Sequence, residues 1–285
     1  MGRSLFIGDS HVCGYVTKPN QVGPGSYDLW QDNNYAELYS IENNNRPTVV
    51  YAMPGTTNSA YTDWMYAMLK KYNDIDEIFV LMSAFNRFML AFDGSLSTDS
   101  IPVDYFTKQL FFTSSDTWRH AGKHNVDIYV DLTTKGDKFQ LFNKPTQDDY
   151  KNFVGISYTE EKGLMIPDLR KHTYMQVKMF FEMNTHLEQR EFYKNIYIWN
   201  SLCEKRNIKC YLFNMRERQK LPNNYNYYGE LNHTVISSMS IEEYFKSEDI
   251  DHNKYFISDQ EHYNKEYHQL IATKFIPWLK NQKSS

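Results

Sequence analysis

RSLFIGDSH, residues 3–11, is the stretch that decides the fold. Its apolar run ends at Gly8, and the short polar residues Asp9 and Ser10 follow at once. Such a run, stopped by a glycine, is typical of a buried strand that meets a sharp turn. In open parallel sheets, ligands bind beyond the carboxyl ends of the strands. We therefore expect a buried first strand with reactive polar groups at its end.

Helical and strand patterns alternate after this first strand. The apolar spacing predicts helices over residues 34–40 and 59–69, and further strands over residues 48–52 and 77–82. Alternation of this kind is typical of a parallel sheet that is covered by helices on both faces. The sequence thus predicts an α/β fold, a three-layer α/β/α sandwich with a mainly parallel central sheet of about five strands.

The pattern changes in the middle of the chain and then resumes. Short alternating runs over about residues 93–168 predict an inserted, partly β subdomain, with strand-like stretches at 126–130 and 138–142. Helical spacing returns over about 170–206, and residues 209–214 form a predicted fourth strand. Two more helices are expected, at 241–245 and 265–279. We interpret residues 1–285 as a single domain that carries this insertion.

Composition excludes several classes of protein. The 285 residues are 41% hydrophobic and 23% charged, as in a folded globular protein. Lysine plus arginine (31) and aspartate plus glutamate (35) nearly balance at a net charge of −4, so the basic footprint of a nucleic-acid binder is missing. The cysteines Cys13, Cys203 and Cys210 fit neither a disulfide framework nor a zinc site, and we interpret them as free thiols in a reducing compartment. No metal or other cofactor is expected.

Membrane insertion and export by a cleaved leader are also not expected. No stretch of about 18 apolar residues occurs, and the N-terminal apolar run is too short for a signal peptide. These features favour a cytoplasmic or virion-associated protein without a membrane span. The sequence leaves the oligomeric state open.

The polar residues at the two ends of the chain could form a nucleophilic site. A serine becomes a nucleophile when a base takes its proton, a carboxylate orients that base and hydrogen-bond donors stabilise the oxyanion. Ser10 follows the first strand, and Asp259 and His262 stand three apart, a spacing that can place both on one side of a helical turn. Gly55 and Asn86 follow the second and third strands, where both could line an oxyanion hole.

These residues fall into four blocks that resemble the marker blocks of the SGNH or GDSL hydrolases, a family of serine esterases and acylhydrolases. The blocks are Gly8-Asp9-Ser10, Gly55, Ala84-Phe85-Asn86-Arg87 and Asp259-Gln260-Glu261-His262. The resemblance implies a flavodoxin-like hydrolase fold without a metal. It also implies that Ser10 is the nucleophile, His262 the base and Asp259 its orienting carboxylate. The Ser10 and Gly55 N–H groups and the Asn86 amide would then form the oxyanion hole.

The third block departs from the family pattern, with Ala84 in place of glycine and Arg87 in place of the usual aspartate. Arg87 could bind an anionic group of a substrate, since its guanidinium pairs bidentately with carboxylates, or it could form an ion pair with Asp63 or Asp93. His11 could contact the substrate beside Ser10, or it could be a solvent-exposed turn residue.

The expected function is hydrolysis of a short-chain acyl ester, such as an O-acetyl group on a carbohydrate, through an acyl-enzyme. Two alternatives remain open. One is a non-catalytic glycan-binding module, phage- or surface-associated, because the chain has 23 tyrosines and 18 phenylalanines but only 12 glycines. The other is a lipid acylhydrolase. A metal-dependent hydrolase ranks behind both, because clustered ligands are missing from the sequence pattern.

Overall fold

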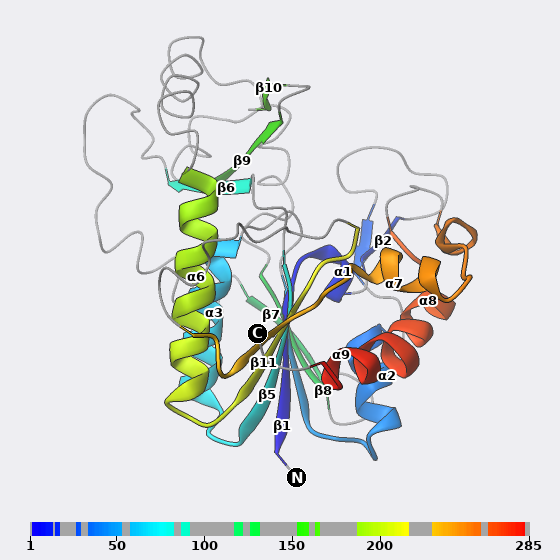
Figure 1. Ribbon diagram of the computed structural model, residues 1–285, viewed down its shortest axis with the longest axis horizontal. Coiled ribbons are helices and arrows are strands. Elements are labelled where there is room, and N and C mark those ends of the chain that lie inside the picture. Colours follow the sequence, from blue (N-terminus) through cyan, green and yellow to red (C-terminus); the bar gives the residue numbers. More distant parts are fainter. Residues whose placement is uncertain are drawn as a thin grey trace.

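A computed structural model describes most of the two ends of the chain and several strands between them (Figure 1). All structural statements below concern these residues. They are residues 2–13, 15–17, 27–29, 34–52, 58–82, 87–91, 117–121, 126–131, 153–159, 163–165, 187–216, 230–257 and 262–282.

A seven-stranded sheet forms the centre of the described chain (Figure 1). Its strands lie in the order β12 (Thr234–Ile236), β11 (Lys209–Phe213), β5 (Ile75–Leu81), β1 (Arg3–Gly8), β4 (Thr48–Ala52), β8 (Val126–Asp131) and β7 (Thr117–Ala121). All neighbours pair in parallel except β7, which runs antiparallel to β8 at the edge. The predicted α/β fold with a mainly parallel sheet is confirmed.

Strands β1, β4, β5 and β11 are buried on both faces, which explains why they are almost continuously apolar. Side chains alternate along β1: Leu5 and Ile7 pack into the core on one face, and Phe6 packs into the core on the other. The strand is fully buried from Ser4 to Ile7.

Helices α3 (Asn58–Lys71) and α6 (Leu187–Glu204) pack against each other and cover one face (Figure 1). The predicted apolar stripe of α3 is confirmed, because its members are all buried: Tyr61, Trp64, Met65, Met68 and Leu69. On α6 the buried residues Ile196, Trp199 and Cys203 recur at helical spacing.

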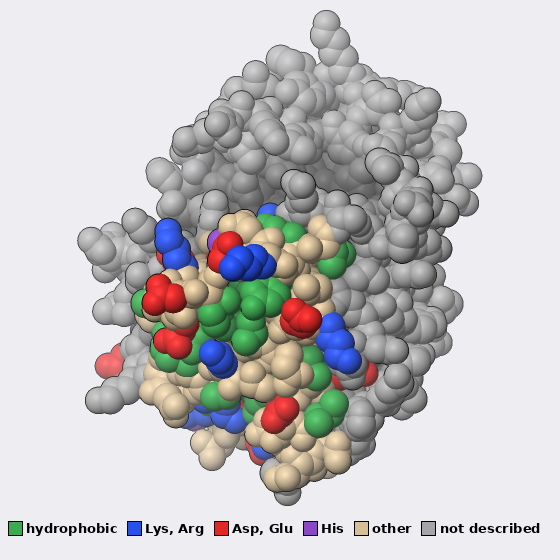
Figure 2. Space-filling view, turned by 90° about the vertical axis from the view of Figure 1, so that its right-hand side faces the viewer, with side chains coloured by type: hydrophobic (Ala, Val, Ile, Leu, Met, Phe, Trp, Pro, Cys, Tyr) green, Lys and Arg blue, Asp and Glu red, His purple; other side chains and the backbone are tan. Residues whose placement is uncertain are grey.

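The other face is covered by α2 (Tyr35–Glu42), α7 (Ile241–Ser247) and a C-terminal helical run (Figure 1). That run comprises α8 (Lys265–Leu270), the π-helical turn η5 (Ile271–Phe275) and α9 (Ile276–Lys280). Figure 2 shows this side from outside, with apolar side chains visible between charged ones. The partly buried hydrophobic residues on this core are Ile41, Ile250, Tyr255, Phe256, Leu270 and Trp278.

Strands from residues 93–168, the expected insertion, contribute to two sheets. β8 pairs with β4, so β7 and β8 extend the central sheet. β9 (Phe153–Thr159) pairs with β10 (Gly163–Met165) and with β6 (Arg87–Ala91) in a three-stranded antiparallel sheet. A two-stranded sheet joins β2 (Tyr15–Thr17) to β3 (Tyr27–Leu29). The expected strand at 138–142 lies outside the described residues.

The strand order creates a switch point beside β1. The next two strands of the parallel sheet, β4 and β5, lie on opposite sides of β1. Their ends are level, since Gly8 pairs with Ala52 and Ile7 pairs with Val80. The chain thus passes from β1 to β4 and then crosses over β1 to β5, and ligands bind at the carboxyl ends where strand order reverses in this way. Ser10 follows directly after β1 at this edge.

Candidate functional site

The turn after β1 is tight because the short helix α1 (Ser10–Cys13) folds back onto the strand. A Cβ atom on Gly8 would lie 2.2 Å from Val12 Cγ2 and 3.0 Å from Leu81 Cβ, so only glycine fits. The Asp9 carboxylate accepts a hydrogen bond from the His11 N–H at 3.0 Å. Gly8 and Asp9 thus fix where the backbone of Ser10 begins α1.

The segment that carries His262 is held by backbone pairing. The Ile257 N–H donates to the His262 carbonyl at 2.9 Å, and the Asn264 N–H donates to the Tyr255 carbonyl at 2.8 Å. These bonds pair residues 255–257 with residues 262–264 in the antiparallel direction, so His262 lies in a paired backbone. We call residues 255–257 and 262–264 the C-terminal hairpin.

The C-terminal hairpin brings His262 to the start of α1. His262 is buried, and its ring centroid lies 4.8 Å from that of His11. Residues from the two ends of the chain therefore meet at the carboxyl end of β1. His11 is partly buried, with its ring beside that of His262.

A third histidine, His268 on α8, lies behind this pair. Its Nδ1 accepts a hydrogen bond from the Tyr35 N–H at 3.3 Å, and its ring stacks on Tyr35 with centroids 5.6 Å apart. Burial, followed by the proximity of His11 and His262, lowers the pKa of His268 to about 3. His268 is therefore neutral at physiological pH, and its Nδ1 is available to accept the hydrogen bond from the Tyr35 N–H.

Tyr263, next to His262, is buried. Its ring stacks between Phe256 (4.7 Å between centroids) and Tyr267 (4.0 Å). Its hydroxyl donates to the Glu242 carboxylate on α7. Burial, and then the bonded Glu242, raise the pKa of Tyr263, so the hydroxyl stays protonated and remains a donor.

The residues predicted to form the site are described to different extents. Ser10 and His11 begin α1, and the His262 ring lies beside that of His11. Arg87 is the first residue of β6, in the part of the chain that contacts α3, but its side chain is not described. Gly55, Asn86 and Asp259 lie outside the described residues. Of these three, Gly55 follows Ala52 of β4 by three positions and Asn86 follows Leu81 of β5 by five.

The sequence pattern gave no role to Glu242, Tyr263 or His268. Tyr263 and Tyr267 are four apart, a spacing that indicates stacking on a helix, but nothing in the sequence joins them to Glu242. The ring of His268 is separated from His262 by six positions, which is no recognised spacing for a pair. Only the packing of α7 and α8 brings these residues together.

Two classes of feature are missing from the described part of the chain. None of its helices is long and apolar enough to cross a membrane. No three of its His, Cys, Asp and Glu side chains are grouped so that they could hold a metal ion. The buried thiols of Cys203 and Cys210 lie together within the core, away from this edge of the sheet.

Comparisons with known proteins found no relative of this chain. No family model, no curated protein and no solved structure matches it. The likeness to the SGNH hydrolases thus rests on four short blocks of residues. The function must be inferred from the residues of this chain and from how they are arranged.

Proposed function

We propose that this protein is a serine esterase of the SGNH type, with a three-layer α/β/α fold of the flavodoxin-like kind. The observation that carries the proposal is the contact between the His262 and His11 rings, 4.8 Å apart between centroids. His11 directly follows Ser10, so a buried histidine from the C-terminal end contacts the sequence neighbour of the proposed nucleophile. The reversal of strand order beside β1 supports the same location.

Ester hydrolysis at this site would proceed in two acyl-transfer steps. Ser10 Oγ attacks the ester carbonyl as His262 takes its proton, and the tetrahedral intermediate then collapses as His262 protonates the leaving alcohol. Water, deprotonated by His262, attacks the acyl-enzyme and releases the acid and Ser10. Asp259, three residues before His262, would hold the imidazole in the required tautomer.

The oxyanion would be stabilised by donors that follow three neighbouring strand ends. Ser10, Gly55 and Asn86 follow β1, β4 and β5, whose carboxyl ends lie side by side in the sheet. A segment of five residues reaches at most about 18 Å, so Gly55 and Asn86 are both within reach of the end of β1. Loss of one oxyanion donor lowers turnover by about 100- to 1000-fold in serine hydrolases. Asn86→Ala is expected to do the same here.

The proposed substrate is a short acyl ester, such as an O-acetyl group on a carbohydrate. Turnover across p-nitrophenyl esters from acetate to palmitate tests this choice. A rate that falls steeply beyond butyrate supports the short-acyl assignment, and a maximum at long chains favours a lipid acylhydrolase.

The test of the proposal is turnover of p-nitrophenyl acetate and butyrate by the wild type, Ser10→Ala and His262→Ala. Ser201→Ala on the exposed side of α6 and His233→Gln beside β12 are matched controls, since both lie away from the carboxyl edge of β1. We expect the two site variants to lose at least about 1000-fold in kcat and the controls to retain it. Mass spectrometry after a fluorophosphonate should find one label, on Ser10.

Full activity in Ser10→Ala, or a wild type with neither turnover nor label, contradicts the proposal. In the second case, retained binding to an acetylated glycan array by Ser10→Ala would favour a non-catalytic glycan-binding module.

A further inference from the structure

Tyr263, the residue after His262, is anchored in the fold at several points. Only 1% of its surface is exposed, and its ring is held between Phe256 and Tyr267. The backbone of Tyr263 also contacts the ring of His268 through a hydrogen bond. The ring, the hydroxyl and the backbone of Tyr263 are therefore each held by a different partner.

The anchor of the hydroxyl, Glu242, is itself fixed at the carboxyl edge of the sheet. The Glu242 N–H donates to the Met215 carbonyl at 3.1 Å, just beyond the end of β11. Arg216 Nε lies 3.4 Å from the Glu242 oxygen that accepts from Tyr263. Arg216 is thus a counter-ion for the carboxylate that accepts the hydrogen bond from the Tyr263 hydroxyl beside the apolar stack.

We propose that Tyr263 is a positioning residue that fixes the backbone and imidazole of His262 beside α1, and that Glu242 is the group that holds it there. The effect of this positioning on catalysis rests on the proposed esterase function. Tyr263 acts through its neighbour, because its stacked and hydrogen-bonded ring holds the backbone from which the His262 side chain extends.

Two substitutions isolate the hydroxyl anchor. Tyr263→Phe removes the hydroxyl and keeps the stacking, and Glu242→Gln keeps an acceptor oxygen but removes the charge. Tyr244→Phe is the matched control, since Tyr244 is a buried tyrosine of the same helix as Glu242 that packs on Trp278. We expect kcat for p-nitrophenyl acetate to fall about 10- to 100-fold in Tyr263→Phe with little change in KM, as for a misplaced base. The loss should be smaller in Glu242→Gln, and Tyr244→Phe should match the wild type.

A second measurement does not depend on turnover. Long-range proton–nitrogen NMR spectra report the tautomer and the titration of each imidazole, and signals are assigned with His262→Ala, His11→Asn and His268→Asn. The charged and titratable groups near His262 include His11 on α1, His268 on α8, and Glu242 with Arg216 behind Tyr263. In Tyr263→Phe we expect the His262 nitrogen signals to shift or to broaden from exchange between orientations, while those of His233 stay in place.

Unchanged His262 signals in a folded Tyr263→Phe variant would overturn the positioning role, as would an unchanged kcat in an active enzyme. If the wild type shows no turnover and no label but the His262 signals change in Tyr263→Phe, the esterase proposal fails and the positioning of His262 by Tyr263 stands.

Discussion

His268 illustrates at the scale of one residue how burial makes stability depend on pH. Its pKa is lowered to about 3, chiefly by burial, whereas an unfolded chain gives histidine a pKa of about 6.5. The unfolded chain therefore binds a proton that the folded chain excludes. Above about pH 6.5 the imidazole is neutral in both states. As the pH falls below this value toward 3, the free energy of unfolding decreases by up to about 1.4 kcal/mol per pH unit.

His268→Asn should reduce this sensitivity to acid. Asparagine retains an acceptor for the Tyr35 N–H but cannot take up a proton. We expect the variant to be about 1–2 kcal/mol less stable than the wild type at pH 7.5, because packing is lost, and the difference to shrink by pH 5. Urea unfolding at pH 7.5, 6 and 5 measures it, with half-buried His233→Asn as the control. Curves that stay parallel to the wild type would show that His268 protonates in the folded state.

Single residues differ in whether the sequence alone reveals their role. Ser10 and His262 could be selected from the sequence because both lie in short blocks of reactive residue types near strand or helix boundaries. Glu242, Tyr263 and His268 could not, because each owes its role to a contact between helices that are distant along the chain. Residue type alone does not separate them from ordinary surface or core positions.

Helix α7 is the element that supports Glu242, and its first turn is closed by a capping box. The Ser240 hydroxyl accepts from the Glu243 N–H at 3.2 Å, and the Glu243 carboxylate accepts from the Ser240 N–H at 2.7 Å. Ser240→Ala leaves the Glu243 amide without this partner and should destabilise the protein by about 1 kcal/mol. Chemical denaturation measures it against Ser201→Ala on the exposed side of α6, for which we expect no change. Equal midpoints for the two variants would mean that the cap does not stabilise α7.

The elements differ in how well the sequence predicts them, for physical reasons. The pattern located β1, β4, β5 and β11 and the helices α2, α3, α7 and α8–α9, because each presents a buried run or stripe. β12, three residues long, is too short to show a period. β8 has a clear strand pattern, but its pairing with β4 could not be predicted, because strand pairing is decided by contacts between distant segments.

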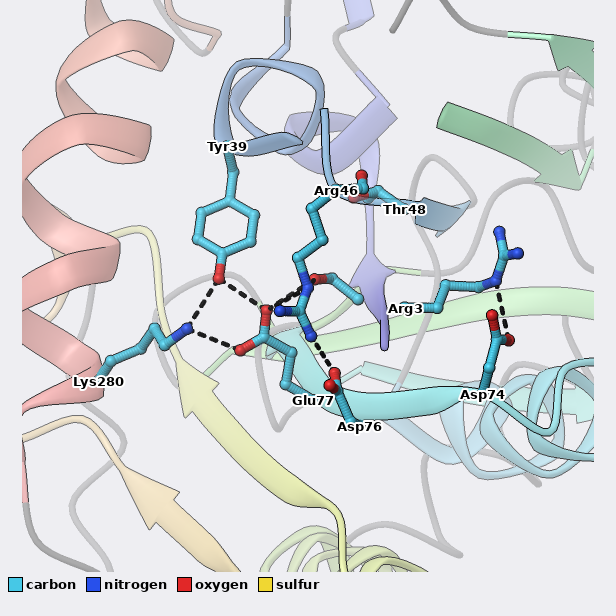
Figure 3. Close-up of polar contacts among 9 residues, drawn as sticks. Arg3, Tyr39, Arg46, Thr48, Asp74, Asp76, Glu77 and Lys280 are labelled. Atoms are coloured by element: carbon cyan, nitrogen blue, oxygen red, sulfur yellow. Dashed lines mark hydrogen bonds and ion pairs between the residues drawn. The ribbon is translucent and has the colours of Figure 1, made fainter. Parts of the chain in front are cut away.

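Across the whole sheet, the carboxyl ends and the amino ends of the strands carry different kinds of polar group. The carboxyl edge holds the histidines near Ser10. Near the amino ends of β1 and β4, Glu77 of β5 accepts from the Ser4 hydroxyl and the Tyr39 hydroxyl, each at 2.6 Å, and from Lys280 Nζ at 2.8 Å (Figure 3). Arg46 Nε lies 3.2 Å from the same carboxylate. Burial alone would raise the pKa of Glu77, but the hydrogen bonds from Lys280, Ser4 and Tyr39 outweigh it and lower the pKa.

Lys280 ends the helical run that begins just after His262, so the Glu77 network ties this run to the sheet at the edge opposite the candidate site. Glu77→Gln leaves two cations facing a neutral amide and should lower the free energy of unfolding at pH 7 by about 3 kcal/mol. Lys280→Met keeps Arg46 as a counter-ion, and its effect should be smaller.

Because the pKa of Glu77 is lowered, the stabilising effect of its carboxylate is present above about pH 4.5 and is lost as the pH falls further. The difference in unfolding free energy between wild type and Glu77→Gln should therefore disappear in acid. Urea unfolding between pH 7 and pH 3 measures this gap, and the His262 imidazole signals of the folded variant should match the wild type, since the network and the site lie at opposite edges. A Glu77→Gln protein as stable as the wild type at pH 7 would mean that desolvation of the carboxylate cancels its ion pairs.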